Sequence, residues 1–179
     1  EDLRMLFAAA QRRGYLASNP AAPIELPELT DKAPGIHTPA QVKAALIEAY
    51  DQDDTLGRMM AIRYFAGLRT AEALRLAEED ILTDRGYIEV KASKSKTRRR
   101  RLVKIQPALA AFLALGGELP LPDANTRLAL LTRSLAKQGI PCPSNVTRHS
   151  FVSYHLAHFG KAGRTALEAG HTEEMVFAH

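Results

Sequence analysis

The stretch Ala66-Gly67-Leu68-Arg69-Thr70-Ala71-Glu72 places an arginine at a corner between two predicted helices. The helix before this corner, at residues 56–66, is apolar on most sides, so we expect it to be central and buried. Gly67 permits close approach of the backbone, and Glu72 can hold Arg69 through a bidentate ion pair. By itself, this pattern fits an ordinary helix-turn-helix corner with a surface ion pair better than it fits an active site.

Helical patterns dominate the rest of the chain. Two short segments, 87–90 and 101–105, instead show the period-two alternation of strands and would pair as a hairpin. The predicted fold class is therefore mainly α with a small antiparallel β-sheet (α+β). Helices are predicted at about 1–17, 38–50, 56–66, 70–76, 107–115, 126–138, 145–159 and 162–169, with a last turn from Thr172.

A proline-rich segment separates the first helix from the rest of the chain. Residues 20–37 contain four prolines together with turn-forming residues, which predicts an extended linker. The chain also begins with Glu1 rather than Met. We therefore expect residues 1–19 to be the tail of a preceding domain and residues 38–179 to be the main domain.

Positive charge is concentrated in one segment. The net charge is +4, but eight of the 24 basic residues lie between Lys91 and Lys104, and without them the chain would be acidic. A hairpin tip this basic suits a phosphate backbone, although a solvated charged loop is the simpler alternative. No aromatic residues are interleaved, so stacking on single strands is not supported. The candidate nucleic-acid contacts are Lys91, Lys94, Arg98, Arg99 and Arg100.

Two further motifs carry polar groups near predicted helix starts. Asn145 and Arg148 are three residues apart and would share a face at the first turn of a helix, where amides and the helix dipole favour anions. His171 follows Gly170, which is placed to end a helix, and could act as a proton donor or acceptor. Taken singly, a capping Asn, a surface Arg and a structural His explain these residues as well.

Several classes of protein are disfavoured. The single cysteine, Cys142, excludes an intrachain disulfide and fits a cytoplasmic location, and no Cys/His cluster has zinc spacing. The acidic pairs are adjacent in sequence and diverge, so we expect neither a metal site nor a metal cofactor. No glycine-rich phosphate loop, signal peptide or membrane-length apolar run is present.

The order of these motifs resembles the catalytic domain of the tyrosine recombinase (phage integrase) family. That order is an Arg with a Glu three residues later, a Lys in a hairpin, an Arg-His pair and a Gly-His pair, over about residues 36–179. The first helix is similar to the last helix of that family's core-binding domain. The residues that match active-site groups are Arg69 and Arg148 (the two arginines), Lys96 with Lys94 as the alternative (the hairpin lysine), and His171, with Glu72 in support.

The resemblance implies metal-free cleavage and rejoining of DNA through a 3′-phosphotyrosyl intermediate, without a cofactor. The two arginines would hold the non-bridging oxygens, Lys96 would protonate the departing 5′-oxygen, and His171 would donate to the phosphate or assist the tyrosine. Asn145 stands where the family usually has His, so it can donate a hydrogen bond but not a proton. The family's nucleophilic tyrosine is expected just beyond His179, so this chain alone is expected to be inactive.

The resemblance also implies double-stranded DNA as the partner, and self-association as a tetramer on paired DNA sites for the full-length protein. It implies a bacterial or phage-encoded, nucleoid-associated cytoplasmic protein. Phage integration, movement of a mobile element and chromosome resolution all remain open as its role. Two alternatives are a non-catalytic DNA-binding relative of the family and a basic RNA-binding module that uses the hairpin tip.

Overall fold

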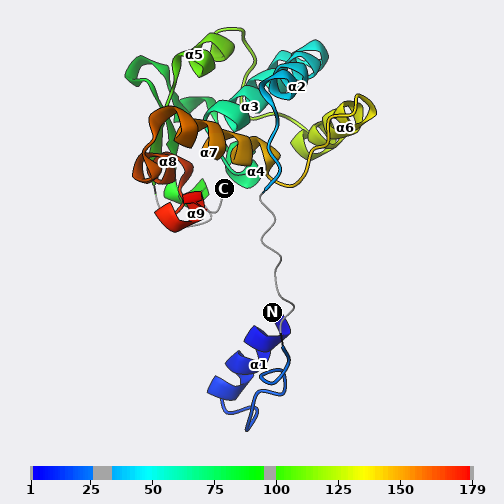
Figure 1. Ribbon diagram of the computed structural model, residues 1–179, viewed down its shortest axis with the longest axis vertical. Helices are drawn as coiled ribbons and strands as arrows, with labels where there is room; N and C mark the ends of the chain where they lie inside the picture. The colour runs from blue at the N-terminus through cyan, green and yellow to red at the C-terminus, as the bar shows by residue number, and fades with distance from the viewer. Residues whose placement is uncertain (1, 26–33, 95–99, 178–179) are drawn as a thin grey trace. The chain divides into compact units, whose positions relative to one another are not determined.

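The computed structural model describes residues 2–25, 34–94 and 100–177 (Figure 1). The segment from Lys91 to Arg100 is called the basic loop; the side chain of Lys94, within it, is not described. The chain divides into two compact units, Glu1–Lys32 and Ala33–His179. In the first unit, α1 (Asp2–Arg12) ends five residues earlier than predicted. The Arg4 guanidinium donates to the Ala22 carbonyl at 2.6 Å, so the chain after α1 folds back on the helix. The first residues of the expected linker, 20–37, therefore belong to the first unit. His37, the last residue of that linker, is buried within the second unit.

The second unit is mainly helical, as predicted. Its centre is α3, whose side chains are buried on most sides and which packs against α2, α5 and α7. The helices are α2 (Pro39–Gln52), α3 (Asp54–Phe65), α4 (Thr70–Ala73), α5 (Pro107–Leu113), α6 (Ala124–Lys137), α7 (Val146–Phe159), α8 (Ala162–Ala169) and α9 (Glu173–Phe177). Among the described residues, no helix has the length and apolar character needed to cross a membrane.

The sheet has three antiparallel strands, in the order β1-β2-β3, rather than the predicted two. They are β1 (Ile81–Leu82), β2 (Tyr87–Val90) and β3 (Arg101–Lys104). Ile88 pairs with Val103, and both are buried against the core. β1 was missed because two residues between short 3-10 turns are too few to show any periodicity.

Two glycines let distant segments approach one another. Gly67 follows α3 with φ +60°, and a Cβ there would lie 2.2 Å from the ring of Phe151 on α7. Gly170 ends α8 with φ +65°, in the left-handed conformation typical of helix-ending glycines. Helix α8 contacts both α7 and β3, so the corner at Gly67, the strand β3, α7 and the end of α8 meet in one place (Figure 1).

Candidate active site

Glu72 lies at the centre of the site, with only 1% of its surface exposed. Its carboxylate accepts from the backbone N–H of Arg69 at 3.0 Å and from Arg69 Nη1 at 3.1 Å. Arg101 makes the bidentate pair, donating from Nη1 at 3.1 Å and from Nη2 at 2.7 Å. The predicted contact between Arg69 and Glu72 is therefore present, and Arg101 is a second partner that the sequence did not single out.

Three arginines from other parts of the chain donate hydrogen bonds to backbone carbonyls at the carboxyl end of α8. Arg101 Nε donates to the carbonyl of Glu168 at 3.1 Å. Arg148 Nη2 donates to the carbonyl of Ala169, and Arg69 Nη2 to that of Gly170 at 3.2 Å. Carbonyls at a helix end lack helical partners and carry the negative end of the dipole, so they suit guanidinium groups. We call these three side chains, Arg69, Arg101 and Arg148, the arginine cluster.

Arg148 is buried, and each of its guanidinium nitrogens makes a hydrogen bond. Nη1 donates to the carbonyl of Gly67 at 2.7 Å, and Nε donates to Nε2 of His171 at 3.2 Å. In this contact the ring of His171 accepts at Nε2. The pKa of Arg148 is lowered to about 9, mainly by burial and also by the charges of Arg69 and Arg101, while the charge of Glu72 opposes the change.

The charges of the site do not balance. Burial raises the pKa of Glu72, but the hydrogen bonds and charges of Arg101 and Arg69 outweigh burial and lower it to about 2. Glu72 is therefore ionised at neutral pH, and Arg148 keeps its charge. Among the described side chains of the site there are three guanidinium groups and one carboxylate, which pairs with Arg69 and Arg101 but not with Arg148, so two positive charges are uncompensated. A site of this kind favours an anion with several oxygen acceptors.

Some predicted site residues lie elsewhere. Asn145 precedes α7 in the left-handed conformation, with φ +58°, and its exposed side chain donates to Ser144 at 3.4 Å. It therefore does not share the first helical turn with Arg148 as expected, and no hydrogen bond joins it to the arginine cluster in the part of the chain that the structure describes. Lys96, Arg98 and Arg99 lie outside the described residues, as does the side chain of Lys94.

Two of the predicted DNA contacts make ion pairs within the protein. Lys91 Nζ lies 2.8 Å from a carboxylate oxygen of the buried Asp80 and 3.4 Å from one of Glu79. Arg100 is exposed and pairs with Glu89 on β2. These carboxylates fix the two basic side chains at the base of the basic loop and neutralise part of their charge.

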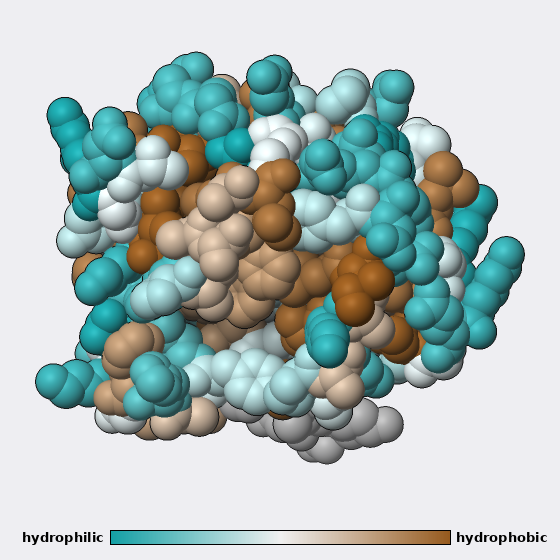
Figure 2. Space-filling view, turned by 90° about the horizontal axis from the view of Figure 1, so that it is seen from above, coloured by the Kyte–Doolittle hydropathy of each residue, from teal (hydrophilic) through white to brown (hydrophobic). Residues whose placement is uncertain are grey.

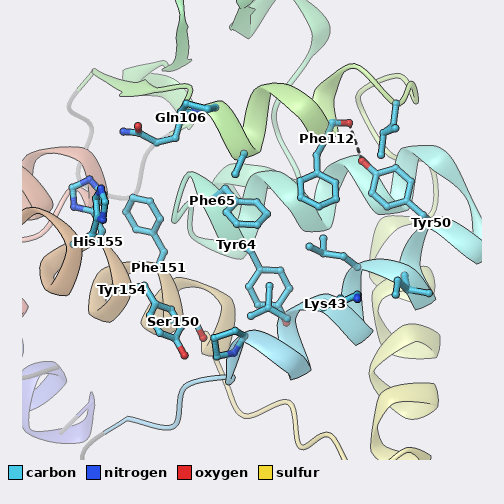
Figure 3. Close-up of a pocket in the computed structure, with 18 of the residues that line it drawn as sticks. Lys43, Tyr50, Tyr64, Phe65, Gln106, Phe112, Ser150, Phe151, Tyr154 and His155 are labelled. Atoms are coloured by element: carbon cyan, nitrogen blue, oxygen red, sulfur yellow. Dashed lines mark hydrogen bonds between the residues drawn. The ribbon is translucent and has the colours of Figure 1, made fainter.

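A large cavity lies apart from the arginine cluster. It has a volume of about 900 Å³, and none of the predicted site residues lines it. Figure 3 shows Phe65 and Phe112 on one side and Phe151 and Tyr154 of α7 on another. Figure 2 shows apolar side chains gathered at the centre of one face of the protein, framed by polar ones. An apolar cavity is unsuited to a charged phosphate.

Neither a metal cluster nor a tyrosine accompanies the arginine cluster within the described residues. No group of three His, Cys, Asp or Glu side chains could hold a metal ion there. The hydroxyl of Tyr154 donates to the backbone carbonyl of His37 at 3.0 Å, so it is engaged at the start of the second unit. A nucleophilic tyrosine for this site would have to come from outside the described residues.

The chain is similar in sequence to known recombinases. It is 29% identical over 201 residues to the tyrosine recombinase XerD of Xanthomonas axonopodis pv. citri, an alignment that covers 95% of this chain. It is 27% identical over 194 residues to a putative integrase/recombinase of Sinorhizobium fredii, which covers 99% of this chain. The chain spans 65% and 60% of the length of these two relatives. No model of a known protein family matches the sequence.

The fold is that of a tyrosine recombinase catalytic domain. The catalytic domain of bacteriophage HP1 integrase matches 80% of this chain with a TM-score of 0.65 and 21% identity, over 84% of its own length. The Tn1549 transposon integrase, solved in complex with circular intermediate DNA, matches 98% with a TM-score of 0.73 and 17% identity, over 72% of its length. The sequence similarity and the shared fold together support the tyrosine recombinase family for this chain.

Proposed function

We propose that this chain is the catalytic part of a site-specific recombinase that cleaves and rejoins double-stranded DNA. The observation that carries the proposal is the arginine cluster, in which Arg69 and Arg101 share the carboxylate of Glu72 while the buried Arg148 is held by backbone carbonyls. A DNA phosphodiester is an anion whose non-bridging oxygens accept hydrogen bonds from such groups. DNA as the partner is supported by the related Tn1549 transposon integrase, which was solved in complex with circular intermediate DNA.

Arg69 and Arg148 are proposed to hold the scissile phosphate. Each terminal nitrogen of a guanidinium carries two hydrogens, so a bond to a carbonyl leaves one hydrogen for a phosphate oxygen. Both Nη2 atoms are fixed by neighbouring carbonyls, those of Gly170 and Ala169. Fixed donors stabilise the charge that develops on the phosphate without reorganising during the reaction. Glu72 positions Arg69, and the carbonyls of Gly67 and Ala169 position Arg148.

The proposed reaction is a transesterification. The oxygen of a tyrosine after His179 forms a bond to phosphorus, and the bond from phosphorus to the 5′-oxygen breaks. The tyrosine loses its proton, with His171 assisting or donating to the phosphate, and the 5′-oxygen gains a proton from Lys96. Lys96 is outside the described residues and the tyrosine would follow His179, so the roles of both rest on the resemblance. Asn145 is proposed as a hydrogen-bond donor near the substrate.

The remaining assignments extend this proposal. The first unit would be the end of a core-binding domain, and the residues of the basic loop, from Lys91 to Arg100, would contact the DNA backbone. The full-length protein would assemble as a tetramer on paired DNA sites, in the cytoplasm. This chain without a following tyrosine would bind DNA without cleaving it.

A nicked suicide substrate tests the proposal. The full-length protein should accumulate a covalent protein–DNA adduct in the presence of EDTA, and Arg69→Ala or Arg148→Ala should abolish it. An adduct that persists in both variants would refute the roles of the two arginines. Normal DNA binding without any adduct would favour the alternative of a non-catalytic DNA-binding relative.

A further inference from the structure

Arg63 on α3 is a partly buried cation without a carboxylate partner among the described residues. Its Nη2 donates to the hydroxyl of Thr70 at 3.0 Å, and its Nη1 contacts the sulfur of Met60 at 3.5 Å. Its Nε is buried and has no hydrogen-bond partner. Burial lowers the pKa of Arg63, which means that the surroundings disfavour its charge. Because an unpaired buried charge is costly, a counter-ion from outside the chain would relieve it.

Arg63 lines a small polar cavity, which we call the Arg63 pocket. Its volume is about 220 Å³, below the usual range of roughly 300–1,000 Å³ for pockets that hold drug-sized ligands. The pocket is bounded by α3, α6 and the residues that lead into α7, and no Asp or Glu is among its lining residues. The polar residues that line it with Arg63 are Tyr64, Thr70, Thr132, Cys142, Ser144, Asn145 and Thr147. These groups suit a small oxyanion.

The start of α7 adds to the attraction for an anion. Asn145 precedes the helix, but its side chain makes no capping hydrogen bond, so it does not satisfy the first amides of α7. The positive end of the dipole of this 14-residue helix therefore faces the residues that line the pocket. This feature and the unpaired Arg63 are independent, and both favour negative charge.

Residues that line the Arg63 pocket are close in the chain to residues of the arginine cluster. Thr70, which accepts from Arg63, directly follows Arg69 in the chain. Asn145 comes three residues before Arg148, and both the start of α4 and the start of α7 have residues in each site. A strand whose phosphate occupies the arginine cluster would therefore have neighbouring phosphates near the pocket.

We propose that the Arg63 pocket binds a second phosphate of the DNA strand, beside the phosphate held by the arginine cluster. This inference rests on the proposed function, because it takes DNA as the ligand. In this proposal Arg63 binds and positions the DNA strand and takes no part in the chemical step. The proposal also assigns the side chain of Asn145 to this neighbouring phosphate, through its lining of the pocket.

The test measures the affinity of the 179-residue chain for a fluorescent DNA duplex at several salt concentrations. Arg63→Met should weaken binding about tenfold and should reduce the slope of log K against log salt by about 0.9, as expected for one lost phosphate contact. Arg63→Lys should keep most of the slope. The control Arg85→Gln removes the same charge from the exposed turn at the opposite end of β2 and should leave the slope unchanged.

Thermal unfolding separates binding from a structural role. Without DNA, Arg63→Met should raise the melting temperature, because an uncompensated charge is removed; a lower melting temperature with an unchanged salt slope would overturn the proposal. A wild-type chain that fails to bind duplex DNA would refute the proposed function. Normal binding with the same slope in Arg63→Met would refute the Arg63 pocket alone. If inorganic phosphate at constant ionic strength stabilises the wild type while Arg63→Met keeps the full slope, the pocket is a site for free phosphate.

Discussion

Glu72→Gln is the substitution that most directly perturbs the arrangement of the arginine cluster. Gln has nearly the same shape but no charge, so Arg69 and Arg101 lose their shared counter-ion. The pKa of Glu72 falls from its usual 4.5 to about 2 on folding, which corresponds to about 3 kcal/mol of stability. Breaking a buried ion pair by removing one partner costs a similar amount, about 3–5 kcal/mol. We therefore expect Glu72→Gln to lose about 3 kcal/mol at pH 7.

The pH dependence of this loss has a definite sign. Since the pKa of Glu72 is lower in the folded protein, its stabilisation is present above pH 4.5 and disappears as the pH falls towards 2. Urea unfolding from pH 7 to pH 2.5 should therefore show the gap between wild type and Glu72→Gln closing below pH 4.5. Glu79→Gln, at an exposed carboxylate, serves as the control and should change little. A gap that is absent at pH 7, or that stays constant with pH, would refute the reasoning.

Two further predictions concern the same site. Gly170→Ala and Gly160→Ala both place alanine at a left-handed position and should each cost about 1–2 kcal/mol in thermal unfolding, but only Gly170→Ala should also weaken duplex binding. The Cβ of an alanine at position 170 would lie 3.2 Å from the Arg101 guanidinium, whereas a Cβ at position 160 would meet no atom within 4 Å. Equal effects of the two variants on duplex binding would contradict this prediction. Arg148→Gln should weaken duplex binding at pH 7, because it removes one guanidinium of the arginine cluster. A folded Arg148→Gln variant that binds duplex DNA as well as the wild type would contradict this.

The fold was largely predictable from local patterns. The apolar run of α3, the glycine that ends α7 and the period-two alternation of β2 are local signals, and the positions of these elements agree with the prediction to within two residues. Residues 81–82 carry no such signal, because their strand is defined by pairing with β2 rather than by their own sequence. The fold-back of residues 19–22 onto α1 is likewise a matter of tertiary hydrogen bonds.

The site was predictable only in part. Arg69, Glu72, Arg148 and His171 stand out through the spacing and order of their motifs, and the structure brings them together. Arg101 is the last of four consecutive arginines, and nothing in the sequence distinguishes it from its neighbours. Its role comes from the register of β3, which pairs it with Val90 and directs it to Glu72. Arg63 was missed for a similar reason, since a cation in an apolar helix shows its lack of a partner only in three dimensions.

The central claim is that Arg69 and Arg148 act on one phosphate. A double-mutant cycle tests it through duplex affinities of the wild type, Arg69→Gln, Arg148→Gln and the double variant, each shown to be folded by thermal unfolding. Two donors to the same phosphate should be coupled, so the double variant should differ from the sum of the single effects by about 1 kcal/mol or more. Effects that add to within about 0.5 kcal/mol would mean that the two guanidinium groups bind independently, and would contradict the account.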